Sequence, residues 1–417
     1  MIGIIYNIFI QFWLILNFVT TTYCLYQIVV GIAGLFKSRP ITQCAPKNRF
    51  AAIISARNEE GVITNLIDSL KLQNYPRELF DVIIVADNCT DNTAKTAREA
   101  GAVVYERYNQ VEVGKGYALK FIFEKIFAER DQYDAFCIFD ADNIVDCDFF
   151  LHMNNAIEAG YEVAQGYRDM KNPADSWISG GHSLFFWMEN RFFNQARSFL
   201  GISATINGTA YMIKADLIRE IGYNPVTSTE DIEFTMQCIL AGKRVGWVPG
   251  AKSYDEQPVT LSQSLTQRMR WINGTMQNFK RYVGRLAKKM VVSPDWDTID
   301  ALLYLCGYPT MLFGLVAGAL SVCFAFLHIF DPIGTLLNMG LLMVGAIFGF
   351  WFIALLTLIL EKKFSHDLLE SIVWYPIFSL FWVIIYIVCI FKKKVEWKPI
   401  AHVRNISITE MESRIRR

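Results

Sequence analysis

Four long apolar runs constrain most strongly how this chain of 417 residues can fold. None contains an Asp, Glu, Lys or Arg, and they extend over Met1–Phe36, Ala301–Phe330, Pro332–Leu360 and Ser371–Phe391. A bilayer crossing needs about 20 mostly apolar residues, and each run is long enough. We therefore expect an integral membrane protein, with an N-terminal anchor at residues 1–36 and a C-terminal membrane region at residues 301–391. The first run lacks the basic start and cleavage site of a signal peptide, so we expect it to be retained.

Charged residues around these runs orient the chain. Basic residues follow the first run closely, at Lys37, Arg39, Lys47 and Arg49. Positive residues mark the cytoplasmic side, so we expect a multi-pass protein of the cell membrane whose large polar segment faces the cytosol. The fourth run would then place the basic tail, residues 392–417, outside. Either this run, with Pro376 near its start, bends back, or the tail is external; we favour a cytosolic tail.

Composition excludes several classes of protein. The chain has 40 basic and 40 acidic residues, so no net charge draws it towards nucleic acid. Its nine cysteines are scattered and form no Cys-X-X-Cys motif. This pattern is neither a disulfide framework nor a zinc site.

Strand and helix patterns alternate through the polar segment, which we delimit as residues 50–272. Strands are predicted at Phe50–Ser55, Asp81–Ala86, Ala102–Tyr105 and Ala135–Phe139, and helices at Glu59–Leu72, Thr90–Ala100 and Gly116–Phe127. Repeated units of this kind predict a parallel sheet with helices on both faces. That is the doubly wound α/β architecture, which typically binds nucleotides.

Two carboxylates follow the last of these strands directly. Asp140 and Asp142 emerge together where the apolar run Ala135–Phe139 ends. Open sheets bind ligands at the carboxyl ends of their parallel strands, and two adjacent carboxylates repel unless a cation lies between them. The pair therefore favours a hard divalent ion that holds a diphosphate. The alternative is a surface turn in which Asp makes local hydrogen bonds.

Polar residues also follow the other predicted strands. Asp87 ends the second strand pattern, where a carboxylate can hydrogen-bond a base edge or a sugar hydroxyl. Lys115 lies between two glycines in a turn that suits phosphate, although it lacks the Walker spacing. The stretch Ser55–Glu60 opens a helix whose free amides could face an anion or a ribose; plain N-capping by Asn58 is the alternative.

Six motifs in order resemble those of a known family. They are Ser55-Ala56-Arg57-Asn58-Glu59, Asp87-Asn88-Cys89-Thr90-Asp91, Gly114-Lys115-Gly116-Tyr117-Ala118-Leu119, Asp140-Ala141-Asp142, Thr229-Glu230-Asp231 and Gln267-Arg268-Met269-Arg270-Trp271. The series resembles family 2 glycosyltransferases, and within them the membrane-bound processive branch of cellulose, hyaluronan and poly-N-acetylglucosamine synthases. The resemblance implies a GT-A fold, a nucleotide-sugar donor, Mg²⁺ or Mn²⁺, and inversion at the anomeric carbon.

The resemblance implies a role for each donor-side residue. Asp87 would bind the uracil or ribose side of a UDP-sugar, Lys115 would lie near the nucleotide, and Arg270 would face the diphosphate. Asp140 and Asp142 would bind the donor and its metal, with Asp142 the more direct ligand. In many relatives the second motif reads Asp-Asp-Gly-Ser-Thr-Asp, whereas here it begins Ala-Asp-Asn-Cys. Asp87 is therefore the residue of this motif that would contact the uracil.

The same resemblance makes Asp231 the catalytic base and places Gln267 and Trp271 at the acceptor. A hydroxyl is a poor nucleophile until a carboxylate takes its proton, which Asp231 can do if burial or neighbouring Glu230 raises its pKa. The alternative for this motif is a helix N-terminus capped by Thr229, and the two interpretations are compatible. Gln267 and Trp271 have helical spacing, with an interfacial helix and a Trp anchor as the alternative.

The segment that follows, residues 273–300, has an amphipathic pattern. Basic residues alternate with apolar ones, namely Lys280, Arg281, Arg285, Lys288 and Lys289 with Phe279, Val283, Leu286 and Met290. The pattern predicts a helix that lies on the inner leaflet and holds the acceptor site against the membrane.

Other residues receive structural interpretations. The five histidines are isolated and lack paired ligand spacing, so we expect structural roles for His152, His182, His328, His366 and His402. We expect Phe185, Phe186 and Trp187 to pack in the core or near the membrane. The stretch Gly201–Gly208 is an acceptor-side loop by its position alone.

We therefore expect a metal-dependent hexosyl or N-acetylhexosaminyl transferase. It would move a sugar, with N-acetylglucosamine as one candidate, from a UDP-sugar to a growing polysaccharide at the inner face of the membrane. One alternative is single transfer to a lipid acceptor, because lipid glycosyltransferases share the donor machinery. Another is a non-catalytic subunit for polysaccharide assembly or transport, against which the intact Asp140, Asp142, Asp231 and Arg270 argue.

Overall fold

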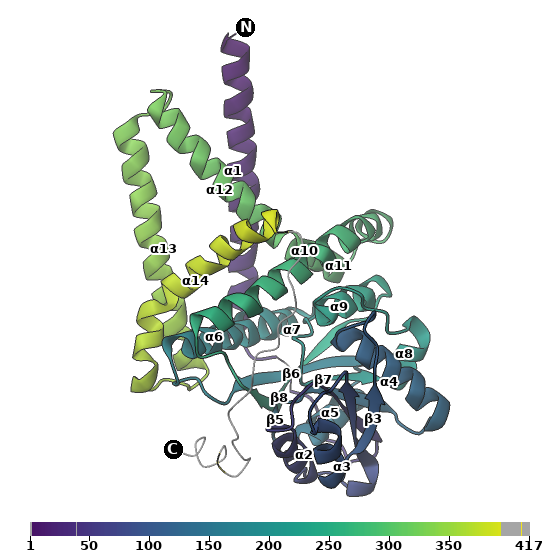
Figure 1. Cartoon of the computed structure of the whole chain (residues 1–417). Coiled ribbons are helices and arrows are strands. Elements are labelled where there is room, and N and C mark those ends of the chain that lie inside the picture. Colours follow the sequence, from purple (N-terminus) through teal and green to yellow (C-terminus); the bar gives the residue numbers. More distant parts are fainter. Residues whose placement is uncertain (1, 39, 393–409, 411–417) are drawn as a thin grey trace.

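The computed structural model describes residues 2–38, 40–392 and 410. Apart from Lys392 and Glu410, the predicted basic tail lies outside the described residues. A compact α/β unit forms one part of the molecule, and the long helices α1 (Ile2–Ile32), α12 (Gly307–Phe326) and α13 (Pro332–Leu360) project from one side of it (Figure 1). The predicted combination of an α/β domain with apolar helices is therefore confirmed.

The α/β unit is built on one sheet of eight strands in the order β3-β2-β1-β4-β7-β6-β8-β5. The strands are β1 (Phe50–Ala56), β2 (Phe80–Asp87), β3 (Val103–Arg107), β4 (Ala135–Asp140), β5 (Ile144–Val145), β6 (Val163–Met170), β7 (Tyr211–Lys214) and β8 (Val245–Asp255). The four strands predicted from sequence exist and are mutually parallel.

The expectation of a wholly parallel sheet is wrong. Strand β7 runs antiparallel between β4 and β6, and β5 pairs antiparallel with the edge of β8. Antiparallel neighbours need no helical crossover, so such short strands can join the sheet from loops. Their four and two residues are too short to show a periodic pattern in the sequence.

Helices cover both faces of the sheet, as predicted. The helices of one face are α2 (Ile63–Lys71), α3 (Thr93–Glu99) and α5 (Phe149–Glu158), and those of the other are α4 (Lys115–Glu129), α6 (Trp177–Met188), α8 (Ala215–Ile221) and α9 (Glu230–Leu240). Side chains alternate along each strand, so Ile53 packs in one core and Ile54 in the other. Strands β1, β2 and β4 end at the same edge, where Ser55 pairs with Asp140.

The predicted helix starts shift by several residues. The helix expected from Glu59 begins at Ile63, because residues 59–62 form a turn in which Ile63 donates its amide to the Glu59 carbonyl. The helix expected from Thr90 begins at Thr93, whose amide is bound by the Asp91 carboxylate at 3.0 Å. Polar side chains at these positions bind backbone groups, which shortens the helices.

Within the described residues, four helices are long and apolar enough to cross a membrane. They extend over Asn7–Leu35, Gly307–Phe326, Pro332–Leu360 and His366–Phe391. The second predicted run is divided, because Ala301 to Leu305 belong to the short helix α11 (Trp296–Leu305). Helix α1 packs along α12, where the Trp13 indole nitrogen donates to the Ser321 hydroxyl at 2.8 Å.

The predicted amphipathic segment is the second half of one continuous helix, α10 (Leu261–Val292). Leu286 on its apolar side is fully buried and packs with Tyr282 against α9 and α11. This part of the apolar face therefore contacts protein and not the leaflet. All nine cysteines are free.

Candidate active site

A cavity of about 480 Å³ opens at the shared edge of β1, β2 and β4. All eight residues singled out from the sequence line it, namely Asp87, Lys115, Asp140, Asp142, Asp231, Gln267, Arg270 and Trp271. They come from the ends of strands β2 and β4, the turn after β4, and the helices α4, α9 and α10 (Leu261–Val292). The structure thus brings the predicted residues together.

Asp87 is held at the end of β2 by the neighbouring strand. The Arg107 guanidinium donates to the Asp87 carboxylate at 2.7 Å, and both side chains are buried. The two residues are register partners in the parallel pair of β2 and β3. A charge-assisted bond between adjacent strand ends fixes the orientation of the carboxylate towards the cavity.

Lys115 joins the start of α4 to the Asp140 carboxylate. Its ammonium donates to Asp140 and, at 2.6 Å, to the carbonyl of Gly208. Burial by itself would lower the pKa of Lys115, but the charges of Asp140 and Glu230 outweigh it and raise that pKa. Burial would likewise raise the pKa of Asp140, but Lys115 and nearby Arg168 lower it. Both groups are therefore charged at neutral pH.

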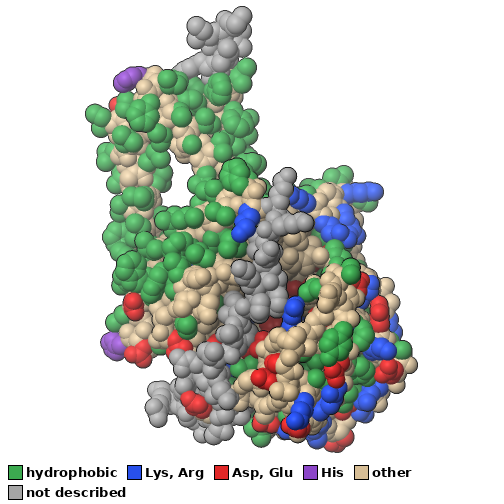
Figure 2. Space-filling model, in the orientation of Figure 1, with side chains coloured by type: hydrophobic (Ala, Val, Ile, Leu, Met, Phe, Trp, Pro, Cys, Tyr) green, Lys and Arg blue, Asp and Glu red, His purple; other side chains and the backbone are tan. Residues whose placement is uncertain are grey.

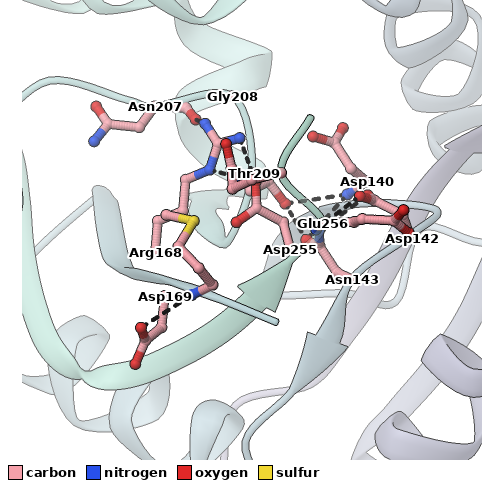
Figure 3. A network of polar contacts seen from close by, with 12 residues as sticks. Asp140, Asp142, Asn143, Arg168, Asp169, Asn207, Gly208, Thr209, Asp255 and Glu256 are labelled. Carbon is pink, nitrogen blue, oxygen red and sulfur yellow. Dashed lines mark hydrogen bonds and ion pairs between the residues drawn. The ribbon is translucent and has the colours of Figure 1, made fainter. Parts of the chain in front are cut away.

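Asp142 lies at the junction of β4 with the end of β8 (Figure 3). One of its carboxylate oxygens accepts the Glu256 amide at 3.2 Å, and the other accepts the side-chain amide of Asn143 at 3.2 Å. The buried ammonium of Lys171 donates to the backbone carbonyl of Asp142. These contacts position the carboxylate and place a cation close to it.

An ion pair that the sequence analysis missed lies beside these carboxylates. The Arg168 guanidinium in β6 donates to Asp255 in β8 at 2.8 Å and to the Asn207 carbonyl at 3.0 Å (Figure 3). Burial raises the pKa of Asp255 to about 6, although Arg168 opposes the shift. The sequence carried no signal for this pair, because the burial of every residue of β6 is seen only in the folded sheet.

The carboxylates fit a hard divalent cation. The second Asp255 oxygen, Oδ1, is buried with no hydrogen-bond partner within the described residues, and Asp140 and Asp142 lie close enough to raise its pKa. In the described part of the chain, the only three metal-ligand atoms within 4.8 Å of one another belong to residues 146–148. Two carboxylates would leave the other coordination positions of Mg²⁺ or Mn²⁺ to water and substrate phosphates.

Asp231 also lines the cavity, in the first turn of α9. Its carboxylate accepts the Ile232 amide at 2.8 Å, and a Cβ on Gly208 would lie 3.3 Å from its other oxygen. Burial raises the pKa of Asp231, although that amide, Lys115 and Arg168 oppose the shift. Burial and the Asp231 charge raise the pKa of Glu230 to about 7. Both carboxyls therefore hold a proton at a higher pH than an ordinary carboxylate does.

Helix α10 packs on the start of α9 at a glycine. A Cβ on Gly274 would lie 2.5 Å from the Thr229 hydroxyl, so a larger residue would separate the two helices. Asn278 secures the contact by donating to the Thr229 hydroxyl at 2.9 Å. The contact holds Asp231 at a fixed position relative to Arg270 of α10.

The predicted acceptor residues form the far wall. The side-chain amide oxygen of Gln267, Oε1, is buried with no hydrogen-bond partner within the described residues. Trp271 stacks on Trp382 of α14 (Leu369–Phe391), with ring centroids 6.1 Å apart and 18° between the planes. Further lining residues here were missed from sequence: Glu189, Tyr304, Tyr308 and Trp382.

The structural interpretations of other residues hold in part. His182 is fully buried, and its Nε2 lies 2.8 Å from the Ser264 hydroxyl, as expected for a structural histidine. Trp187 is buried and donates to Asp169 at 2.9 Å. Phe185 and Phe186 line the cavity and do not serve only as packing. Their position on the cavity side of α6 was not visible from composition.

The fold and this site define a glycosyltransferase. Residues 46–274 match the family described as "Glycosyltransferase like family 2", and the chain belongs to this family. The α/β unit has the GT-A fold that the motifs implied. Among solved structures, a mannosyltransferase from Pyrobaculum calidifontis, in complex with GDP-Man and Mn²⁺, superposes with a TM-score of 0.56 at 16% identity, covering 91% of this chain and 100% of that chain.

Curated relatives include enzymes of lipid glycosylation. A probable glycosyltransferase, YdaM of Bacillus subtilis, is 24% identical over 385 residues, covering 84% of this chain and 86% of the relative. A beta-monoglucosyldiacylglycerol synthase of Nostoc is 26% identical over 272 residues, covering 62% of this chain and 56% of the relative. This chain thus spans about half the length of the Nostoc protein.

Proposed function

We propose that this protein transfers one sugar, with inversion, from a UDP-sugar to a hydroxyl of a lipid acceptor that enters from the membrane. One observation carries the proposal. The cavity extends from the donor-side carboxylates to Tyr308 in α12 and Trp382 in α14, and both helices are candidate membrane spans. An acceptor embedded in the bilayer can reach such a site without leaving the lipid.

The donor would bind at the strand ends. Asp87 would accept hydrogen bonds from the uridine, and Lys115 and Arg270 would neutralise the diphosphate. Asp140 and Asp142 would hold Mg²⁺ or Mn²⁺, which when bound neutralises charge that develops on the leaving diphosphate. Positive charges and hydrogen-bond donor groups at the site where negative charge develops stabilise the transition state more than they stabilise the bound substrate.

The acceptor would be activated on the opposite wall. Asp231 would take the proton of the attacking hydroxyl, and its raised pKa suits it to that task. The partnerless Gln267 oxygen would accept a second hydrogen bond from the acceptor. A single in-line attack from this wall gives inversion. The cyanobacterial relatives named beta-monoglucosyldiacylglycerol synthase support a lipid acceptor.

The cellular placement is part of the proposal. The catalytic unit would face the cytosol, where nucleotide sugars are made, in a multi-pass protein of the cell membrane. Basic residues after α1 support this orientation. The processive synthesis expected from the motifs is the competing function, because a polymer could also use a site that opens towards the membrane.

Product analysis separates the two. We would incubate the full chain in nanodiscs with diacylglycerol, Mn²⁺ and either UDP-glucose, UDP-N-acetylglucosamine or GDP-mannose, and analyse products by mass spectrometry. A lipid that gains one hexose supports the proposal. A long polymer contradicts it in favour of processive synthesis, and the Asp231→Asn protein serves as the inactive control.

A further inference from the structure

Helix α14 contacts the catalytic unit along its whole length. It is apolar and long enough to cross a membrane, yet it packs on both α6 and α10. The contacts from its first turn to its last are Ser371 with Gly180, Tyr375 with Met188, Phe378 with Arg268, Trp382 with Trp271, Tyr386 with Tyr308, and Cys389 with Met269.

These contacts lie on one face of the helix. Positions 371, 375, 378, 382, 386 and 389 follow the spacing of three and four residues that defines a helical stripe. At about 1.5 Å per residue, the stripe is about 27 Å long. A helix that crosses the bilayer would contact a domain outside the membrane over only one or two turns. The contacts of α14 extend along the whole stripe, so this helix lies across the surface of the domain.

Both ends of α14 are held on the side of the catalytic unit. Before the helix, Lys363 donates to Asp169 of β6 at 2.6 Å, and Tyr167 of β6 donates to Glu361 at 2.7 Å. At its other end, Tyr386 stacks on Tyr308 with ring centroids 5.1 Å apart. Tyr308 lies at the start of α12, next to α11 of the catalytic unit.

The outer face of α14 is apolar and exposed. It presents Val373, Ile377, Leu380, Ile384 and Val388, each between 43% and 58% exposed. Figure 2 shows this hydrophobic surface continuing onto α12 and α13. The hydrocarbon part of a lipid leaflet fits this surface, because exposing a large apolar patch to water is unfavourable.

We infer that α14 does not span the membrane but lies along it, with its outer face in the lipid leaflet next to the catalytic unit. Of the four candidate helices, α1, α12 and α13 then cross the bilayer. Lys392, at the end of α14, is on the same side as the active site. The positive-inside rule is satisfied, since the basic residues after α1 and after α14 share one side.

Protease protection tests this topology without altering α14. Full-length protein would carry one epitope tag after Arg417, in the exposed turn at Asp131, or in the α12–α13 turn at Asp331, in sealed membrane vesicles of known orientation. We expect the Arg417 and Asp131 tags to be digested from the same side, at least tenfold faster than the Asp331 tag. Digestion of the Arg417 tag together with the Asp331 tag would overturn the inference. Digestion after detergent shows that every tag can be cut.

A second, independent observation concerns Glu189. This residue begins the π-helix η3 (Glu189–Gln195), which continues α6, and it lines the cavity with Phe185 and Phe186 one turn before it. Within the described residues its carboxyl has neither a hydrogen bond nor an ion pair, and only longer-range charges act on it. A π-helix within an α-helix often marks a functional site.

The surroundings of Glu189 make an unpartnered carboxyl costly. Burial raises the pKa of Glu189 to about 7; Arg168 opposes the shift and Asp231 adds to it. Arg168 is not available to pair with it, because its guanidinium binds Asp255 and lies 3.9 Å from the Phe186 ring centroid. Glu189 is half-buried in the cavity wall, so a substrate that fills the cavity can supply the hydrogen-bond partner that this carboxyl lacks.

We propose, on the basis of the proposed function, that Glu189 binds a hydroxyl of the acceptor next to the one that Asp231 deprotonates. The donor diphosphate is excluded as its ligand, because two anionic groups repel. A hydroxyl donor suits the carboxyl in either protonation state. The neighbouring Phe185 and Phe186 would contact the apolar part of the acceptor.

Steady-state kinetics of Glu189→Ala and Glu189→Gln test this assignment, with exposed Glu124→Gln as the matched control. Losing a hydrogen bond to a charged group should raise the acceptor KM about tenfold to a hundredfold in Glu189→Ala. The donor KM and slow donor hydrolysis should stay within about twofold of wild type. Glu189→Gln should be intermediate.

An unchanged acceptor KM, or a change confined to the donor KM, would overturn the role of Glu189. Failure of the proposed function is distinguishable, because it shows in the wild-type product. If the wild type extends a polymer instead of a lipid, the same comparison is made with that acceptor. Melting temperatures with and without UDP report whether each variant is folded and binds nucleotide.

Discussion

Trp271 of the catalytic helix α10 stacks on Trp382 of α14, with 6.1 Å between ring centroids and 18° between ring planes. The pair joins a residue of the Gln-X-X-Arg-Trp motif to the helix that we place along the membrane. Both rings line the cavity. The acceptor wall therefore depends on the docking of α14.

Replacing Trp382 with Ala should lower transfer about tenfold, because Trp271 loses a stacked partner worth on the order of 1 kcal/mol beyond its buried area. The loss should appear in the acceptor KM, with donor KM unchanged. Ile384→Ala, on the exposed face of the same helix, is the control and should behave as wild type. A change in donor KM alone would show that Trp382 does not act at the acceptor wall.

Asp142→Ala should lower transfer by at least about a hundredfold, because the developing charge on the leaving diphosphate loses its stabilisation. Chelation of divalent ions should do the same to the wild type, and Mn²⁺ or Mg²⁺ should restore it. Binding of UDP, measured by calorimetry with and without Mn²⁺, should be metal-dependent in the wild type only. Metal-dependent UDP binding by the variant would exclude Asp142 as a ligand.

Asp231→Asn should lower kcat by about two to four orders of magnitude, as expected for loss of a general base. Donor binding should be retained, because Asn has the same size as Asp and the proposed donor contacts do not include Asp231. Product formation is followed by mass spectrometry. Turnover at the wild-type rate would disprove the assignment of Asp231 as the base.

The pH dependence of transfer should reflect the pair Glu230 and Asp231. Burial raises the pKa of Asp231, so this base loses its charge at a higher pH than an ordinary carboxylate, and the pKa of neighbouring Glu230 is about 7. We expect kcat/KM to rise with pH up to about 7, above the range of an ordinary carboxylate. In Glu230→Gln the repelling charge is absent, so the acid limb should move to lower pH. If the acid limb of the pH profile stays in place, Glu230 does not influence the pKa of the base.

Gly181→Ala should destabilise the fold by about 1–3 kcal/mol, the usual cost of overpacking. A Cβ at this position would lie 2.6 Å from the Phe378 ring of α14, which has no room to move away. Thermal unfolding in detergent measures the effect. Gly340→Ala in α13, where a Cβ meets nothing within 4 Å, is the control and should not lower the melting temperature.

Motif residues were predictable because their chemistry and their strand-end positions are local properties. Asp87 and Asp140 each end an apolar run, and parallel strands bring such ends to one edge. Arg168 and Asp255 were not predictable, since they lie on strands that pair through the second half of the sheet. No spacing in the sequence relates residues 168 and 255.

The sequence by itself predicted an α/β domain, the motif residues that line the cavity and four apolar segments. Only the tertiary structure decided that Glu189 enters the cavity and that α14 lies against α6 and α10. Hydropathy measures how strongly a residue avoids water, and an apolar side chain can avoid water equally well in a protein core or in lipid. The stripe of α14 from Ser371 to Cys389 packs against protein, whereas the opposite face of the helix stays exposed. Which face is buried is decided only when the helices pack together.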